Sequence, residues 1–218
     1  MTDTETARSG PRRWRGLEPE DRRAARRSQL VEAGMQIMGT EGAAAATMRA
    51  TCREAALTER YFYESFGSRD ELLVAVLDEV VLAARDTILA ALETAPTDAP
   101  LLIRHVVKAF TAYVTKDPRR GRIMFVESQS EPALWDRGRE LMAEFTNPIS
   151  FALEAMYGGE KRDAVNSELN SVGLFGALAF IYQAHTQSSK ISRKRLVEHI
   201  SLMIEAQARV NSTPAGKA

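Results

Sequence analysis

Residues 47–73 constrain the fold of this 218-residue chain more than any other stretch, because two short helical segments meet there at a tight turn. Residues three and four apart lie on one side of a helix, which places three residues on the inner face of the first segment: Met48, Cys52 and Ala55. By the same spacing, Phe62 and Phe66 anchor the inner face of the second segment. The other side chains of the second segment must therefore face outward.

Both segments begin after a threonine that is suited to cap a helix. Thr47 and Thr58 each precede a helix-compatible run, where a hydroxyl can accept a hydrogen bond from an unpaired backbone N–H. At about 100° per residue, the face opposite the two phenylalanines carries Arg60, Tyr61 and Glu64, with Tyr63 on its flank. This pattern is typical of a helix that contacts a partner.

The order of residues in this stretch resembles the helix-turn-helix signature of TetR-type transcriptional repressors. The matching positions are Thr47, the run Ala55-Ala56-Leu57-Thr58, the pair Phe62-Tyr63, then Phe66, Ser68-Arg69 and Leu72-Leu73. Ala56 departs from the family, which usually has Gly at a left-handed turn position, and there a Cβ costs roughly 1 kcal/mol or more. Thr51, Cys52 and Ser65 also replace commoner residues.

The resemblance implies double-stranded DNA as a partner and assigns roles to named side chains. The candidate DNA-binding residues are Thr47, Arg49, Thr58, Arg60, Tyr61, Tyr63 and Arg69. Arg60 is expected to read guanine and Tyr61 a thymine methyl or base edge, while Thr47, Tyr63 and Arg69 match family positions that hold the DNA backbone. The roles of Glu59 and Glu64 stay open, since their charge is repelled by DNA unless they accept from a cytosine amino group.

Charge is unevenly distributed along a chain whose formal net charge is zero. Residues 8–27 hold eight arginines against three carboxylates, a local charge of +5. Arginine suits bidentate contact with phosphate or guanine, although codon usage in a GC-rich genome explains the preference for arginine over lysine equally well. Residues 1–18 are expected to be a disordered basic arm, either lying on DNA or solvated without a role.

Hydrophobic periodicity predicts an all-α protein with helices across 19–68 and 69–210, followed by a disordered tail at 211–218. The resemblance implies that 19–68 is a three-helix DNA-binding domain and that 69–210 is an effector-binding and dimerisation domain. A first helix from about Pro19 buries five residues and ends at Gly42: Leu30, Ala33, Gly34, Ile37 and Met38. A helix of about 25 residues from Arg69 would span almost 40 Å and join the two domains. Further helices are expected at about 102–116, 119–127, 132–157 with a kink at Pro148, 161–188 and 192–209, with a loop at 94–100.

The helix expected at 161–188 is apolar on most of its circumference between Val172 and Tyr182. Such a helix must be covered on more than one side, and TetR-like proteins pair their last two helices with those of a second subunit. We therefore expect a homodimer. The candidate interface residues are Val172, Phe175, Ala179, Leu196, Ile200 and Ile204.

Catalytic and metal-binding patterns are missing from the sequence. The three histidines are scattered, a lone cysteine cannot build a zinc finger, and no phosphate-binding glycine loop occurs. We therefore expect no enzymatic activity, no cofactor and no metal. One buried cysteine, no secretory leader and no apolar run of membrane-spanning length indicate a cytoplasmic protein without a membrane partner.

The resemblance implies a ligand-operated switch, in which a small, mostly apolar effector enters the helical body and releases a dimeric repressor from a palindromic operator. The candidate pocket residues are His105, Phe110, Tyr113, Met124, Phe125, Trp135, Met142, Phe145 and Tyr182. The same residues at helical spacing are equally typical of a packed core. The alternatives are therefore a DNA-binding regulator without an effector and, from another class, a helical-bundle small-molecule carrier or enzyme.

Overall fold

A computed structural model describes residues 19–141, 164–187 and 190–212, and every regular element within these ranges is helical. This confirms the predicted all-α class. The N-terminal elements are α1 (Pro19–Thr40), η1 (Ala43–Ala45), α2 (Met48–Glu54) and α3 (Glu59–Ser65), followed by α4 (Arg69–Glu93). The remaining elements are α5 (Ala99–Lys116), α6 (Pro118–Arg122), the π-helix η2 (Ile123–Glu127), α7 (Ser128–Ser130), η3 (Pro132–Leu134), α9 (Ala164–Gln187) and α10 (Arg193–Ser212).

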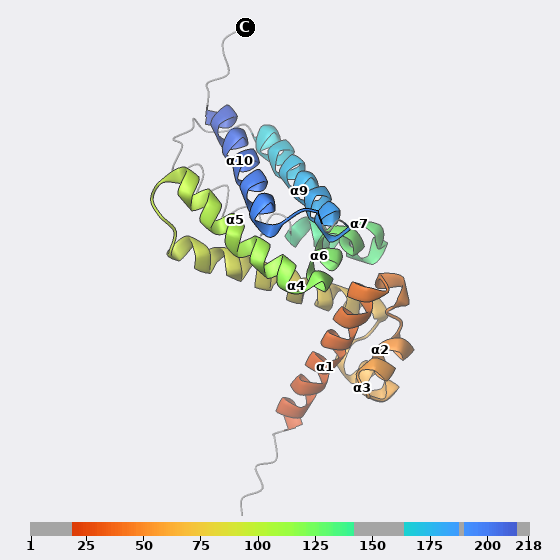
Figure 1. Cartoon of the computed structure of the whole chain (residues 1–218). Helices are drawn as coiled ribbons and strands as arrows, with labels where there is room; N and C mark the ends of the chain where they lie inside the picture. Colours follow the sequence, from red (N-terminus) through yellow and green to blue (C-terminus); the bar gives the residue numbers. More distant parts are fainter. Residues whose placement is uncertain (1–18, 142–163, 188–189, 213–218) are drawn as a thin grey trace, which may run out of the picture.

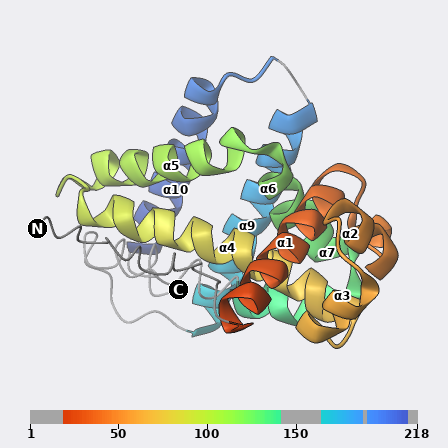
Figure 2. The same ribbon diagram turned by 90° about the horizontal axis from the view of Figure 1, so that it is seen from below.

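The first three α-helices form a small group at one end of α4, and the other helices form a larger body around the rest of α4 (Figure 1). Within the body, α5 packs against both α4 and α10, and α9 lies against α6, η2 and α10. Seen from below, α4 runs out of the N-terminal group and continues beneath α5 (Figure 2). The long helix therefore belongs to both parts of the molecule.

The predicted inner stripe of α1 is buried in full, from Leu30 to Met38. It packs against the first turns of α4, where Leu72, Leu73 and Val76 are also buried. Gly34 permits this close approach, since a Cβ there would lie 2.9 Å from the Val76 Cγ2 atom. Burial of these side chains against one another holds the N-terminal group on α4.

A reciprocal cap starts α4 at the position that the sequence predicts. The Ser68 hydroxyl accepts a hydrogen bond from the backbone N–H of Glu71 at 3.2 Å, and the Glu71 carboxylate accepts from the backbone N–H of Gly67 at 2.8 Å. The helix then runs for 25 residues, as predicted, with a buried face that extends to Ile88 and Ala91. Predicted Leu92 is only partly buried.

Boundaries differ from the predictions at three places in the body. Asp98 caps α5 and Pro100 lies in its first turn, so the preceding loop is shorter than 94–100. The segment predicted as one helix over 119–127 is α6 followed by the π-helix η2. The last helix continues to Ser212, beyond its predicted end at 209.

The helix predicted at 132–157 is present at 135–141 after η3, and the rest of it, including the kink predicted at Pro148, lies outside the described residues. The predicted arm at 1–18 and most of the predicted tail also lie outside them. Within the described ranges, no helix combines the length and the apolar character that crossing a membrane requires.

Candidate nucleic-acid interface and its connection to the helical body

The turn between α2 and α3 has the left-handed residue that its sequence predicts. Ala56 has a φ of 51°, the only positive φ among the described residues other than glycine. Its N–H donates to Arg53 O at 3.2 Å, and the Leu57 N–H donates to Cys52 O at 2.9 Å. These two bonds form the Schellman arrangement that ends a helix, which normally has glycine at the Ala56 position.

The two predicted capping threonines behave differently. The Thr47 hydroxyl accepts a hydrogen bond from the Ala50 N–H at 3.2 Å, as predicted. Thr58 occupies the N-cap position of α3 with extended backbone, but its side chain makes no capping hydrogen bond. The prediction of a hydroxyl cap at Thr58 was therefore wrong, and its side chain lies exposed beside the start of α3.

Phe62 and Phe66 anchor α3 to the N-terminal core as predicted, with both rings buried and their centroids 5.7 Å apart. Cys52 of α2 is also buried, and this burial raises the pKa of its thiol. Thr51 beside it is fully buried, and its hydroxyl has no hydrogen-bond partner within the described ranges. This core orients α3 relative to α1 and α2.

Three long side chains extend from the outward surface of α2 and α3. The Arg49 and Arg60 side chains are 83% and 84% exposed, and Tyr63 is 62% exposed. Arg49 lies 3.4 Å from the carboxylate of Glu59 at the start of α3. These positions leave the predicted reader Arg60 and the predicted backbone contact Tyr63 accessible to a partner.

Tyr61 is less accessible than the helical spacing indicates. It is half-buried, and the Arg26 guanidinium of α1 lies 4.5 Å from its ring centroid. Arg26 also approaches Glu64 at 3.5 Å, and Glu64 in turn pairs with Arg60 at 2.9 Å. The sequence shows that Arg26 and Arg27 are positively charged, but it does not show what they contact. The packing of α1 on α3 places Arg26 over the Tyr61 ring.

Arg69, predicted as a DNA-backbone contact, is engaged within the protein, and its side chain is only 29% exposed. Its Nη2 donates to Ala43 O at 2.7 Å and lies 3.1 Å from the Glu131 carboxylate, and its Nε donates to Ala46 O at 3.2 Å. The side chain is thus occupied within the protein, because the first turn of α4 faces both η1 and the segment after α7. Arg69 ties the N-terminal group to the body.

A second arginine-carboxylate pair holds the same loop from the π-helix. Glu127 is 6% exposed, and its Oε2 accepts the backbone N–H of Ala43 at 2.7 Å. Its Oε1 accepts from Arg122 Nε at 2.9 Å, while Arg122 Nη1 donates to Thr40 O at 2.6 Å. We call these contacts among Thr40, Ala43, Arg122 and Glu127 the junction clasp.

Arg119 extends this connection along α1. Its guanidinium donates to Glu32 at 2.8 Å and to Gln36 at 2.9 Å, and it pairs with Asp117. Hydrogen bonds from Arg119 lower the pKa of the Asp117 carboxyl. A Cβ at Gly39 would collide with the side chain and backbone of Arg119, so α1 and α6 are in direct backbone proximity there.

An aromatic cluster fills the body on the other side of the π-helix. The rings of Phe125 and Tyr182 are stacked with centroids 5.4 Å apart, and Phe110 meets both edge-on at 6.4 and 5.5 Å. The Tyr182 hydroxyl shares a 2.7 Å hydrogen bond with Thr111, and burial raises the pKa of the tyrosine. Phe125 and Glu127 thus connect the cluster and the junction clasp through one turn of π-helix.

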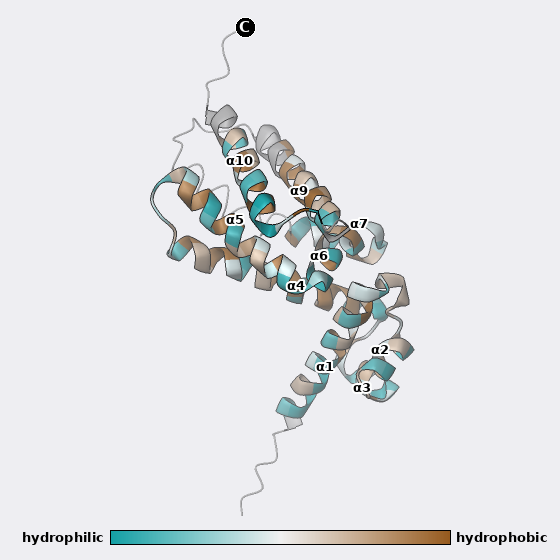
Figure 3. Ribbon diagram, in the orientation of Figure 1, coloured by the Kyte–Doolittle hydropathy of each residue, from teal (hydrophilic) through white to brown (hydrophobic). Residues whose placement is uncertain are grey.

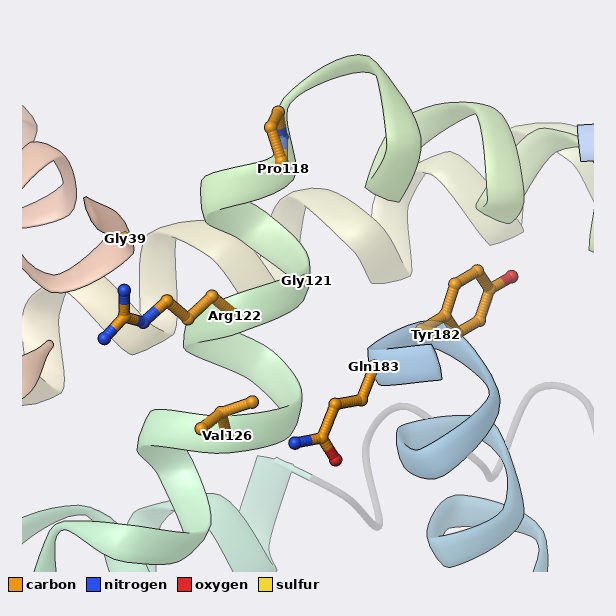
Figure 4. A pocket seen from close by; sticks show the side chains of 7 residues that line it. All are labelled: Gly39, Pro118, Gly121, Arg122, Val126, Tyr182 and Gln183. Carbon is orange, nitrogen blue, oxygen red and sulfur yellow. The ribbon is translucent and has the colours of Figure 1, made fainter. Parts of the chain in front are cut away.

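A cleft of about 350 Å³ lies between α6 and α9, next to both the cluster and the junction clasp. Figure 4 shows Arg122 pointing toward Gly39 and Gln183 extending toward Val126, with the Tyr182 ring at the edge. The lining residues are Gly39, Pro118, Gly121, Arg122, Val126, Tyr182 and Gln183. Of the candidate pocket residues that the structure describes, Tyr182 alone lines this cleft.

The other candidate pocket residues are dispersed. Phe110, Met124 and Phe125 are buried in the core, whereas Trp135 is exposed, donates to Gln129 O at 3.0 Å and borders a separate cleft of about 330 Å³. His105 lies 3.2 Å from Thr94 at the far end of α4. The remaining three are Tyr113, which donates to Val80 O at 2.8 Å on α4, and Met142 and Phe145, which lie outside the described residues. The sequence named them as candidates by residue type and helical spacing, which do not show which of them lie together.

Four of the six candidate interface residues are buried within their own protomer. These are Ala179, Leu196, Ile200 and Ile204, all buried, the last three on the face of α10 that packs against α5. Phe175 is half-buried with its ring 5.9 Å from that of Phe125. Of the six, only Val172 is exposed.

A different face of α9 and α10 carries exposed apolar side chains in the part of the chain that the structure describes. Phe180 and Leu202 are 73% and 66% exposed, and Leu169 and Val172 are exposed on the same side of α9 as Phe180. Among the described residues, a Cβ at Gly173 or Gly176 would meet nothing within 4 Å. Hydrophobic residues are visible along α9 in Figure 3.

Among the described residues, no group of three or more potential ligand side chains is placed to hold a metal ion.

Comparison with protein families identifies the N-terminal group. Residues 30–76 match the family described as "Bacterial regulatory proteins, tetR family". The HTH-type transcriptional regulator BetI of Rhizobium meliloti (strain 1021) is 33% identical over 82 residues, which are 38% of this chain and 38% of BetI. The chain therefore matches well under half of the length of that relative.

Solved structures resemble the fold over most of the chain. A putative transcriptional regulator from Pseudomonas aeruginosa PAO1 has a TM-score of 0.70 at 19% identity, covering 90% of this chain and 95% of its own. The fatty acid degradation regulator FadR from Bacillus halodurans has a TM-score of 0.69 at 15% identity, with 87% and 96% covered. FadR from Bacillus subtilis, solved in complex with stearoyl-CoA, has a TM-score of 0.66 at 14% identity, with 83% and 97% covered. The helix-turn-helix segment of the chain is therefore similar to the tetR family of bacterial regulatory proteins, and the fold of the whole chain is similar to that of solved transcriptional regulators.

Proposed function

We propose that the protein is a transcriptional repressor that binds a palindromic DNA operator as a homodimer and is released by a small effector. The observation that carries the proposal is the accessible surface of α2 and α3, with Arg49, Arg60 and Tyr63 exposed above a buried aromatic anchor. A helix presented in this way fits the major groove, where side chains near its N-terminus contact base edges.

Base reading and attraction to the DNA backbone would come from different parts of the N-terminal group. The α2–α3 unit has no net charge, because three carboxylates balance its three arginines: Arg49, Arg53 and Arg60 against Glu54, Glu59 and Glu64. Positive charge is concentrated instead at residues 8–27. We therefore assign phosphate attraction mainly to the start of α1 and the residues before it, and base reading to α3.

The outward faces of α9 and α10 support a dimer that differs from the one predicted from the sequence. Phe180, Leu202 and Val172 are large apolar side chains left exposed by the protomer, and Gly173 and Gly176 allow a second helix to approach closely. Exposed apolar patches of this kind mark interaction sites. A two-fold pairing through this face would place two recognition helices on one duplex, with half-sites about 34 Å or a multiple apart.

The cleft between α6 and α9 is the proposed effector site. Its volume of about 350 Å³ is at the small end of the range for ligand pockets. A ligand there would touch Tyr182 of the aromatic cluster and Arg122 of the junction clasp, so that occupancy could alter the contact with the loop before α2. The stearoyl-CoA in the complex of Bacillus subtilis FadR is much larger than this cleft, and we propose a smaller effector.

A regulator without an effector is the second candidate, favoured by the close packing of Phe110, Phe125 and Tyr182. A substitution that fills the cleft distinguishes the two candidate functions. Val126→Phe should leave DNA binding intact but abolish release by any compound found in a screen. Release that persists in this variant would place the effector elsewhere. A screen without a releasing compound would support the regulator that lacks an effector.

The central experiment is selection of random double-stranded DNA by the purified protein, followed by footprinting at about 150 mM salt, where affinities are comparable with those in cells. An inverted repeat with half-sites about one helical turn or a multiple apart is expected. Enrichment of no sequence by a folded dimer would contradict the proposal. That result would favour a helical-bundle small-molecule carrier or enzyme.

A further inference from the structure

We infer that Glu64 is a specificity-determining residue, which orients Arg60 so that it reads a guanine in each operator half-site. The inference rests on the proposed DNA-binding function. It also assigns a role to a carboxylate on the recognition helix that simple attraction to DNA does not explain.

The hydrogen bond between the two side chains uses one particular nitrogen of Arg60. Arg60 Nε donates to Glu64 Oε1 at 2.9 Å, one turn along the helix. In the described part of the chain, Arg60 Nη1 and Nη2 contact no acceptor. A guanidinium held through Nε presents both terminal nitrogens outward, and these two can donate together to O6 and N7 of a guanine.

Glu64 is itself held from the other side by α1. Its second oxygen, Oε2, lies 3.5 Å from Arg26 Nη2, and the Arg26 guanidinium rests 4.5 Å from the centroid of the Tyr61 ring. The side chains of Arg26 and Glu64 are 24% and 35% exposed, whereas that of Arg60 is 84% exposed. The contacts therefore connect a partly enclosed arginine on α1, through Glu64, to a largely exposed arginine on α3.

This arrangement favours discrimination over affinity. An exposed ion pair adds little to folding stability, so the main physical effect of the Glu64 contact is to restrict the conformations of Arg60 before DNA arrives. Restricting a side chain in its bound orientation reduces the entropy lost on binding. The carboxylate also repels phosphates, which penalises poses in which Arg60 turns to the DNA backbone instead of a base.

The neighbouring pair between Arg49 and Glu59 lacks these features. Its two side chains are 83% and 53% exposed and lie 3.4 Å apart. No residue of the described chain holds Glu59 as Arg26 holds Glu64. We therefore assign the guanine contact to Arg60 and leave Arg49 outside the inference.

The test compares DNA preferences selected by the full-length protein and four variants. The wild type should select a strong G·C preference at one position of each half-site, and Arg60→Ala should abolish it. Glu64→Gln should reduce that preference about tenfold, within the range of one bidentate base contact, while binding to random DNA becomes stronger. Glu64→Asp keeps the charge but shortens the reach to Arg60, and it should lose the preference as Glu64→Gln does.

Glu54→Gln provides the matched control, because it removes the same charge from an exposed site in the α2–α3 unit and should leave every base preference unchanged. A wild-type motif that survives Glu64→Gln and Glu64→Asp intact would overturn the inference while leaving the proposed function standing. A wild type that selects no motif would overturn both. If Glu64→Asp behaves as wild type and only Glu64→Gln differs, the carboxylate acts by charge alone and the orienting role is wrong. Melting curves establish that each variant is folded.

Discussion

The buried carboxylate of Glu127 accepts the backbone N–H of Ala43, 84 residues earlier in the chain, at 2.7 Å. This contact joins the π-helix of the body to the loop that leads into α2. Its other oxygen is held by Arg122, which also binds Thr40 O. A π-helix is an irregular turn that often occurs at functional sites, and here it has the aromatic cluster on one side and the junction clasp on the other.

Removing the carboxylate of the junction clasp should therefore weaken the fold. Glu127→Ala leaves the Ala43 N–H and the Arg122 guanidinium without their partner, and we expect a loss of about 2 to 3 kcal/mol in the free energy of unfolding. Urea denaturation measures this. Glu41→Ala removes an exposed carboxylate from the same loop and should change stability by less than about 0.5 kcal/mol. Equal losses of unfolding free energy in the two variants would show that the buried contact stabilises the fold no more than an exposed carboxylate does.

Replacing the left-handed alanine should be neutral or stabilising. Ala56→Gly relieves a strain of roughly 1 kcal/mol at φ 51°, partly offset by the greater freedom of glycine in the unfolded chain. Ala55→Gly, one residue earlier with ordinary helical φ, should destabilise by about 0.5 to 1 kcal/mol. Melting temperatures of the two variants test whether their effects on stability differ in this way. A clear fall in the melting temperature of Ala56→Gly would contradict the claim that Ala56 is strained.

The unpaired hydroxyl of Thr51 should cost stability. Thr51→Val keeps the shape of the side chain but removes a buried polar group that has no partner, and we expect a gain of about 1 kcal/mol. Thr47→Val, on the same helix, removes the hydroxyl that caps it and should instead cost about 1 kcal/mol. Chemical denaturation of the two variants should give opposite signs. A loss for Thr51→Val would indicate that its hydroxyl has an ordered partner in solution.

A charge on the uncovered face of α9 should prevent dimer formation without unfolding the protomer. Phe180→Glu places a carboxylate at the centre of the proposed interface, so sedimentation should report a monomer with retained helical circular dichroism. Leu101→Glu, at an exposed leucine of α5, is the matched control and should leave the oligomeric state unchanged. A Phe180→Glu dimer as stable as wild type would exclude this face.

Much of the fold was predictable because the relevant interactions are local. The Thr47 cap, the Ala56 turn and the 25-residue run of α4 each depend on residues within a few positions of one another. Phe62 and Phe66 were also placed correctly, since a helix has only one face that can be buried against the rest of its small domain. Local propensity and periodicity agree at these positions except Ala56, where an alanine takes the left-handed conformation that usually favours glycine.

What required the tertiary structure was the identity of the partner that each side chain meets. Leu196, Ile200 and Ile204 were correctly predicted to be buried. Periodicity does not say whether a helix face is covered by the same chain or by a second copy. In the structure, α5 of the same chain covers this face of α10. Arg69 was identified as a charge at the start of a helix, and only the folded loop supplies the two carbonyls that engage it. The sequence thus determined which residues form helices and which faces are buried, because those depend on neighbours along the chain. Contacts between residues as distant as Ala43 and Glu127 were decided by how the helices pack.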